Sequence, residues 1–160
     1  MHYRDKVLTI ESLCAVVREE RTSGKNIVFT NGCFDLLHVG HVRLLAAARQ
    51  AGDLLVVGVN SDASVRRLKG AGRPLVPQGD RAEVLAALEA VDLVTIFDQD
   101  TPAELIAALE PDVLVKGGDW RPDRIIGREI VERRGGHVLI VPTVEGFSTT
   151  TLAERIRRGG

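Results

Sequence analysis

The chain has 160 residues, of which 44% are hydrophobic and 27% are charged, and its formal net charge is −1 at pH 7. This length predicts one domain with a buried core of its own. The nearly neutral charge gives no electrostatic support for binding nucleic acid or a membrane surface. No apolar run approaches the ~18 residues of a membrane span, and Cys14 and Cys33 belong to no recognisable motif. We therefore expect a cytoplasmic protein with reduced thiols.

Helices and strands are predicted to alternate along the chain. Thr9 is the predicted N-cap of a helix that ends near Gly24, and residues 1–25 are expected to form a helical extension of the single domain 1–160. Apolar runs predict strands at 27–30, 54–60, 93–97, 112–116 and 138–141. Helices are predicted at 39–50, from 62 onward, at 81–90 with Val84, Leu85 and Leu88 facing inward, and at 102–109, 123–134 and 149–158. This alternation predicts an α/β fold, with a doubly wound, mostly parallel five-stranded sheet and helices on both faces.

Polar and glycine-bearing segments directly follow three of the predicted strands. These segments are residues 30–35, 60–62 and 116–119. In doubly wound sheets, ligands bind beyond the carboxyl ends of the strands, near the point where the strand order reverses. We therefore expect the three segments to meet in one binding site.

A pair of histidines opens the predicted helix at 39–50. His38 and His41 are three residues apart, so they lie on one helix face, where the helix N-terminus attracts phosphate. Gly40 lacks the Cβ that would keep a ligand away. The pattern favours a nucleoside triphosphate with both imidazoles facing its phosphates. A surface pair, a core histidine and half of a metal site are the alternatives. Since no matching Cys or His accompanies the pair, we expect no protein-ligated metal.

Five ordered segments of the chain together resemble the HxGH nucleotidylyltransferases, and within them most closely the heptose 1-phosphate adenylyltransferases of the bacterial lipopolysaccharide core pathway. The resemblance covers about residues 27–156. It is carried by residues 30–35 with the histidine pair, 59–62, 68–70 followed by 73–74, 116–120, and 146–150.

The resemblance implies an enzyme that transfers an adenylyl group from ATP, with Mg²⁺ carried by the nucleotide, to D-glycero-β-D-manno-heptose 1-phosphate. The products would be ADP-heptose, for lipopolysaccharide core or a related heptose glycan, and pyrophosphate. It also implies a homodimer. In many relatives the domain is fused to a sugar kinase, for which 160 residues leave no room, so we expect a separate kinase to supply the substrate.

The resemblance also implies roles for individual residues. The catalytic residues would be His38, His41 and Lys69. The nucleotide-binding residues would be Thr30, Asn31, Gly32, Phe34, Gly40, Arg73, Lys116, Gly118, Asp119, Ser148, Thr149 and Thr150. The acceptor substrate would contact Asp35, Asn60 and Asp62.

Several of these residues also have a purely structural explanation. Asp35 would orient the loop before the helix at 39–50 or cap backbone N–H groups, with a water-mediated contact to Mg²⁺ as the functional alternative, and Asp62 would cap a helix. Lys69 and Arg73 would belong to a solvated basic loop spanning residues 69–77, with a mobile, phosphate-closing loop as the functional alternative. Arg81 would either reach phosphate or merely open its helix. One hydroxyl among residues 148–150 would cap the last helix, whose free N–H groups form a second anion site.

Three other functions are alternatives to adenylyl transfer. The first is a cytidylyltransferase acting on glycerol 3-phosphate or another phospho-alcohol; Thr143 stands where some cytidylyltransferases carry Arg, which weakens this reading. The second is a nucleotide-binding sensor without turnover, which would not need His38, His41, Lys69 and Ser148 together. The third is an NAD-binding domain, which is excluded because no G-x-G-x-x-G follows the first strand.

Overall fold

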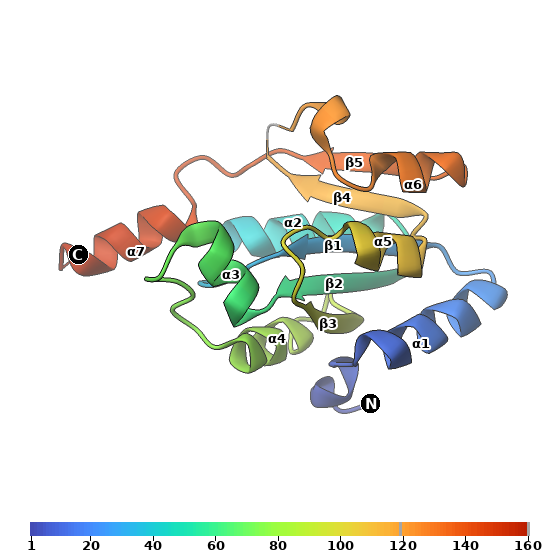
Figure 1. Ribbon diagram of the computed structural model, residues 1–160, viewed down its shortest axis with the longest axis horizontal. Helices are drawn as coiled ribbons and strands as arrows, with labels where there is room; N and C mark the ends of the chain where they lie inside the picture. Colours follow the sequence, from blue (N-terminus) through green and yellow to red (C-terminus); the bar gives the residue numbers. More distant parts are fainter. Residues whose placement is uncertain (119, 160) are drawn as a thin grey trace.

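The computed structural model describes residues 1–118 and 120–159, and a five-stranded sheet forms its centre. All strand pairs are parallel, in the spatial order β3-β2-β1-β4-β5 (Figure 1). The doubly wound sheet is therefore confirmed, and it is parallel throughout. The strands are β1 (Ile27–Gly32), β2 (Leu54–Asn60), β3 (Leu93–Phe97), β4 (Val113–Gly117) and β5 (His137–Val141).

The strand order reverses between β1 and β4. The chain proceeds from β1 outward to β2 and β3, and then returns to place β4 on the other side of β1. The register of β1 with β2 extends to Gly32 and Val59, whereas its register with β4 ends at Phe29 and Leu114. The two central strands thus separate toward their carboxyl ends, where doubly wound sheets bind ligands.

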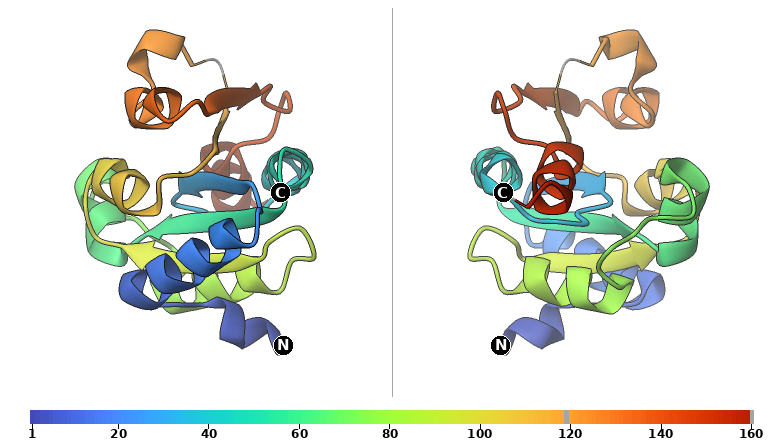
Figure 2. Two further views of the ribbon diagram at one scale, coloured as in Figure 1. Left: turned by 90° about the vertical axis from the view of Figure 1, so that its right-hand side faces the viewer. Right: turned by 90° about the vertical axis from the view of Figure 1, so that its left-hand side faces the viewer.

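Helices cover both faces of the sheet (Figure 2). On one face, α1, α5 and α6 bury side chains such as Leu13 and Val131; on the other, α2 and α4 bury Leu45 and Leu85. Because both faces are covered, β2 is buried along its whole length, which accounts for its uninterrupted apolar sequence. These helices are α1 (Ile10–Thr22), α2 (Val39–Gln50), α4 (Gln78–Ala86), α5 (Ala103–Leu109) and α6 (Arg128–Arg133).

Two predicted helices were wrong in extent. The helix predicted at 81–90 is α4, which begins and ends earlier, and Val84, predicted to face inward, is 48% exposed. The helix predicted at 123–134 is divided into a 3-10 turn, η2 (Pro122–Arg124), and α6. Gly127 between them has a φ of 89°, in the left-handed region that glycine adopts without strain, so the helical path is interrupted there.

The N-terminal segment packs against the edge of the sheet. Thr9 caps α1 as predicted, with its hydroxyl accepting a hydrogen bond from the N–H of Ser12 at 3.2 Å. A 3-10 turn that was not predicted, η1 (Tyr3–Lys6), precedes it, and Val7 bridges to Val94 of β3. In the described part of the chain, no helix combines the length and the apolar character that crossing a membrane requires.

The remaining two helices lie at the carboxyl edge of the sheet. They are α3 (Asp62–Lys69) and α7 (Thr149–Arg157), which Figure 1 shows beyond the arrowheads of the strands. Lys69, predicted to begin a loop, is instead the last residue of α3, and Gly70 ends the helix with a φ of 98°. This edge therefore collects the elements that carry the predicted site residues.

Candidate active site

A cavity of about 560 Å³ opens at the carboxyl edge of the sheet. Its walls come from the β1–α2 loop, the ends of β2 and β4, the end of α3 and the start of α7. Residues predicted for the site that line it are Asn31, Gly32, Phe34, His38, Gly40, His41, Asn60, Lys69, Lys116, Ser148, Thr149 and Thr150. Asp119 lies outside the described residues. The chain segments that were expected to meet do so, while the chemical roles of these residues stay predictions.

The two histidines at the start of α2 contact one another through their rings and through a hydrogen bond. Their rings stack with centroids 3.9 Å apart. His38 is the N-cap: its Nδ1 accepts a hydrogen bond from the N–H of Gly40 at 3.1 Å, and its own N–H donates to Nδ1 of His41 at 3.3 Å. Two of the otherwise unpaired N–H groups of the helix start are thereby satisfied. Both imidazoles are consequently fixed in orientation before any ligand arrives.

These hydrogen bonds also determine where the imidazole protons reside. A ring nitrogen that accepts a backbone N–H carries no hydrogen, so in each neutral ring the hydrogen is on Nε2. Burial lowers the pKa of His38, and burial together with the adjacent His38 lowers the pKa of His41 to about 4. At neutral pH both rings are therefore uncharged, with Nε2–H groups available to donate to an anion.

Gly40 makes room for the imidazole of His38. A Cβ at this position would lie 2.8 Å from Cε1 and 2.9 Å from Nδ1 of His38, because the imidazole folds back over the first turn to reach the N–H of Gly40. Gly40 also lines the cavity, and its predicted contact with a ligand stays a prediction. Phe34 is 5% exposed, and its ring packs against the imidazole of His41, with the two ring centroids 5.3 Å apart.

A lysine and an asparagine bridge the gap between β4 and β1. Nζ of Lys116 donates to Oδ1 of Asn31 at 2.5 Å, and burial lowers the pKa of this ammonium to about 8. One residue earlier on β1, the hydroxyl of Thr30 donates to the carbonyl of Val115, and Thr30 is only 1% exposed. Thr30 was predicted to bind nucleotide, but its contacts connect the strands. Gly118 has a φ of 102°, which turns the chain away from β4.

The start of α7 presents hydroxyls to the same cavity. Ser148 is the N-cap, accepting from the N–H of Thr151 at 3.0 Å, as expected for one hydroxyl of this segment. Thr149 Oγ1 lies 3.4 Å from the carbonyl oxygen of Leu36 and connects α7 to the phosphate loop. The helix starts of α2 and α7 thus face one cavity, which suits a ligand with more than one phosphate group.

Asp35 caps backbone N–H groups, as one of its predicted roles had it, and these groups belong to the segment between α3 and α4. Its buried carboxylate accepts hydrogen bonds from the N–H groups of Leu75 and Val76 at 2.9 Å, and Arg73 Nη1 lies 3.2 Å from it. Burial would make an unpaired carboxylate costly, and these three donors offset that cost. Arg73, predicted to bind nucleotide, is therefore engaged by Asp35 here.

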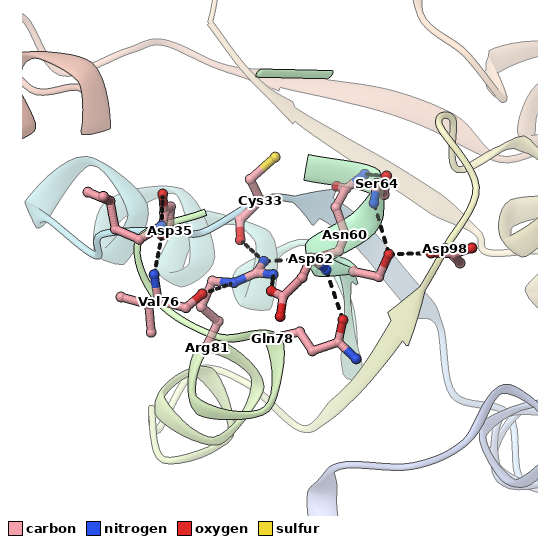
Figure 3. A network of polar contacts seen from close by, with 11 residues as sticks. Cys33, Asp35, Asn60, Asp62, Ser64, Val76, Gln78, Arg81 and Asp98 are labelled. Carbon is pink, nitrogen blue, oxygen red and sulfur yellow. Dashed lines mark hydrogen bonds and ion pairs between the residues drawn. The ribbon is translucent and has the colours of Figure 1, made fainter. Parts of the chain in front are cut away.

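Arg81 is a buried residue with a structural role. The sequence left open whether it reaches phosphate or only opens its helix. It is 2% exposed, and Figure 3 shows its guanidinium amid four acceptors. Its Nε donates to the carbonyl of Val76, and its terminal nitrogens donate to carbonyls of Cys33 and Asn60 and to Oδ1 of Asp62. Asp62 therefore holds this arginine, while the N-cap of α3 is its neighbour, Ser61.

Other cavity residues were not predicted. Asp100, Thr101 and Pro102 follow β3, and Ile125 and Ile126 precede α6. These positions carry no local motif, so only the folded arrangement brings them to the cavity. Among the described residues there is no group of three or more His, Cys, Asp or Glu side chains suited to hold a metal ion.

Comparison with known proteins places the chain in a family. The cytidylyltransferase-like family model matches residues 29–155. The bifunctional protein HldE of Geotalea uraniireducens is 60% identical over 154 residues, which are 96% of this chain and 31% of that protein. The protein of the same name from Bradyrhizobium diazoefficiens is 58% identical over 153 residues, 96% and 31% of the two chains.

A solved structure agrees with these matches. The lipopolysaccharide core biosynthesis protein from Thermoplasma volcanium superimposes with a TM-score of 0.61 at 26% identity, covering 75% of this chain and 97% of that one. The fold and the family are those of a nucleotidyltransferase. The chain belongs to the cytidylyltransferase-like family. It spans about a third of the length of the curated relatives it matches.

Proposed function

We propose that the chain transfers an adenylyl group from ATP to D-glycero-β-D-manno-heptose 1-phosphate, giving ADP-heptose and pyrophosphate. The observation that carries this proposal is the convergence of the two helix starts, the histidine pair and Lys116 on one cavity at the reversal of strand order. The heptose is supported by the motif resemblance and by relatives named bifunctional protein HldE at up to 60% identity. ATP and sugar phosphates are intracellular metabolites, so we place the reaction in the cytoplasm.

The proposed reaction needs positioning more than acid–base chemistry. An oxygen of the sugar phosphate attacks the α-phosphorus of ATP, and the bond from that phosphorus to the oxygen shared with the β-phosphate breaks, so that pyrophosphate leaves. The attacking oxygen is already anionic, so no base is required. His38 and His41 would donate Nε2–H hydrogen bonds to the phosphate oxygens on which charge accumulates, and Lys69 would add a positive charge.

We propose that Mg²⁺ arrives with the triphosphate instead of occupying a protein site. The donor set fits this arrangement, since the phosphate-facing residues His38, His41, Lys116 and Ser148 are neutral or cationic donors, and Asp35 is occupied by Arg73 and backbone N–H groups. Bound to the triphosphate, the ion would neutralise part of the charge on the leaving pyrophosphate. A homodimer is part of the same proposal, and the molecular mass measured by light scattering tests it.

The family match also supports a second candidate. Because the family model is cytidylyltransferase-like, transfer from CTP to glycerol 3-phosphate keeps the same chemistry with other substrates. Pyrophosphate release measured with ATP and CTP, each against heptose 1-phosphate and glycerol 3-phosphate, separates the two. We expect the highest kcat/KM with ATP and heptose 1-phosphate. Equal or faster turnover of CTP would favour the second candidate, and no release with any pair would overturn both.

A further inference from the structure

The last residue of β2 presents an amide group to the cavity. Asn60 is 4% exposed and lines the cavity beside α3. Its Nδ2 donates to Oγ of Ser64 at 3.0 Å, while Oδ1 accepts no hydrogen bond from the described residues. The one fully buried side-chain polar atom without a partner among those residues is Nε of Arg21. Oδ1 of Asn60 therefore reaches the cavity surface.

The direction of the Asn60–Ser64 hydrogen bond is fixed by a third group. The hydroxyl of Ser64 donates to the carbonyl oxygen of Gln99 at 3.0 Å, and a carbonyl can only accept. The single hydroxyl hydrogen of Ser64 is thus committed, so Ser64 Oγ must accept from Asn60. Only the NH₂ end of the amide can donate, which leaves the oxygen end facing the cavity.

The surroundings keep Ser64 in this position. It is 0% exposed, in the first turn of α3, and its N–H donates to the N-cap Ser61, whose hydroxyl donates to Asp98 at 2.5 Å. Figure 3 shows Asn60, Ser64 and Asp98 together at the start of this helix. On the other side of Asn60, Arg81 holds its backbone carbonyl at 2.8 Å. Both the main chain and the amide of Asn60 are therefore preorganised.

We propose that Ser64 is a positioning residue, which orients the amide of Asn60 so that Oδ1 accepts a hydrogen bond from a hydroxyl of the acceptor sugar phosphate. This inference rests on the proposed function. An exposed amide oxygen cannot receive a phosphate oxygen, because both are acceptors, whereas a sugar hydroxyl supplies the donor. The relay from Gln99 through Ser64 thus prepares this part of the cavity for the polyol portion of the acceptor and not for a phosphate.

The test compares Asn60→Ala and Ser64→Ala with Thr95→Val. Thr95→Val is the matched control because it also removes a fully buried hydroxyl, which donates to the carbonyl of Leu8 and touches neither Asn60 nor Ser64. Pyrophosphate release at saturating ATP gives KM for heptose 1-phosphate, and calorimetry gives Kd for ATP. Thermal unfolding confirms that each variant is folded, and Ser64→Cys, with a weakly accepting thiol, replaces Ser64→Ala should that variant not fold.

We expect Asn60→Ala to raise KM for the sugar phosphate about tenfold and Ser64→Ala about threefold, with Kd for ATP changed less than about twofold. Thr95→Val should leave that KM within about twofold. Since Ser64 acts through Asn60, the double variant should be no worse than Asn60→Ala alone. Additive effects, a change in Kd for ATP, or equal effects of Ser64→Ala and Thr95→Val would overturn the inference while the proposed function stands. Lack of turnover by the unsubstituted protein would overturn both.

Discussion

His38 donates its backbone N–H to Nδ1 of His41 at 3.3 Å, while its own ring caps the same helix by accepting from Gly40. Each imidazole therefore has two separable parts. Nδ1 stabilises the start of α2, and Nε2 makes no hydrogen bond with the described residues. This separation allows substitutions that remove one part and keep the other.

His41→Asn should fold like the parent and lose most turnover, because an Asn side-chain oxygen can replace Nδ1 as the acceptor but leaves no donor at the position of Nε2. We expect kcat to fall by about 100-fold or more, the scale for one lost transition-state donor. His41→Gln, whose longer amide reaches toward the Nε2 position, should retain more activity. Steady-state kinetics measure both variants, with His137→Asn, at an exposed position on β5, as the control. Parent-like turnover of His41→Asn would refute the assignment.

Acid should destabilise the protein through the same residue. The pKa of His41 is about 4 in the folded protein, against an ordinary value of 6.5. Between these values the unfolded chain binds a proton that the folded chain excludes, so the free energy of unfolding falls as the pH is lowered from 6.5 toward 4. Urea unfolding at pH 7 and pH 4.5 should therefore show a smaller acid loss for His41→Asn than for the parent. Equal losses would contradict the lowered pKa.

Replacement of Arg81 should test its structural role. Arg81→Met removes the donors to three carbonyls and to Asp62, and the buried acceptors that remain cost about 3–5 kcal/mol of unfolding free energy. Arg43→Met, on the exposed surface of α2, should change it by less than about 0.5 kcal/mol. Urea denaturation measures both. A small effect of Arg81→Met would mean that water or neighbouring groups satisfy these acceptors.

Lys69 is expected to act on the transition state more than on ATP binding. It ends α3 at the cavity wall, so Lys69→Ala should lower kcat about tenfold or more while changing Kd for ATP by less than about threefold. Arg66→Ala, also exposed on α3, serves as the control. Rates at saturating heptose 1-phosphate, with ATP affinities from calorimetry, make the comparison. Unchanged rates in Lys69→Ala would leave Lys69 as a solvated surface residue.

The contribution of Arg73 to ATP binding should depend on the planar geometry of its guanidinium. Asp35 holds it 3.2 Å away, beside the N–H groups of Leu75 and Val76. If the guanidinium leaves Asp35 and binds the triphosphate, Arg73→Lys should raise Kd for ATP several-fold, because a lysine is only a point charge. Calorimetric titration with ATP measures the change. A variant that binds ATP like the parent would show that Arg73 only anchors its segment to Asp35.

The strands of the sheet were predicted well because each is encoded by residues that neighbour one another in the sequence. Apolar runs such as residues 54–60 and the cap at Thr9 are read directly from neighbouring residues, and they place the strands and α1 within a few positions. The interruption at Gly127 was missed because glycine is compatible with several conformations, and its left-handed φ depends on tertiary packing. Helix ends depend on such packing more than helix existence does.

Most residues predicted for the candidate site line the cavity, but the hydrogen bonds that connect them were not predicted. Motif positions identified the residues around the cavity, yet no sequence pattern indicates that Arg81 collects carbonyls from three segments or that Asp35 holds Val76. The sequence also did not predict that the hydroxyl of Thr30 links β1 to β4 or that Gly40 leaves room beside His38. Long-range hydrogen bonds of this kind follow only from the folded arrangement.

The backbone pairing between β1 and β4 is short, so the sheet consists of two halves that are joined over only a few residues. Beyond Phe29 and Leu114, the two halves are joined by the side chains of Thr30 and Lys116 rather than by a continuous backbone ladder. This pair has the shortest register of the four strand pairs, and the cavity opens directly above it. A ligand that contacts both Asn31 on β1 and Lys116 on β4 would link the two halves of the sheet. Occupancy of the site should therefore slow amide hydrogen exchange along the whole of β4.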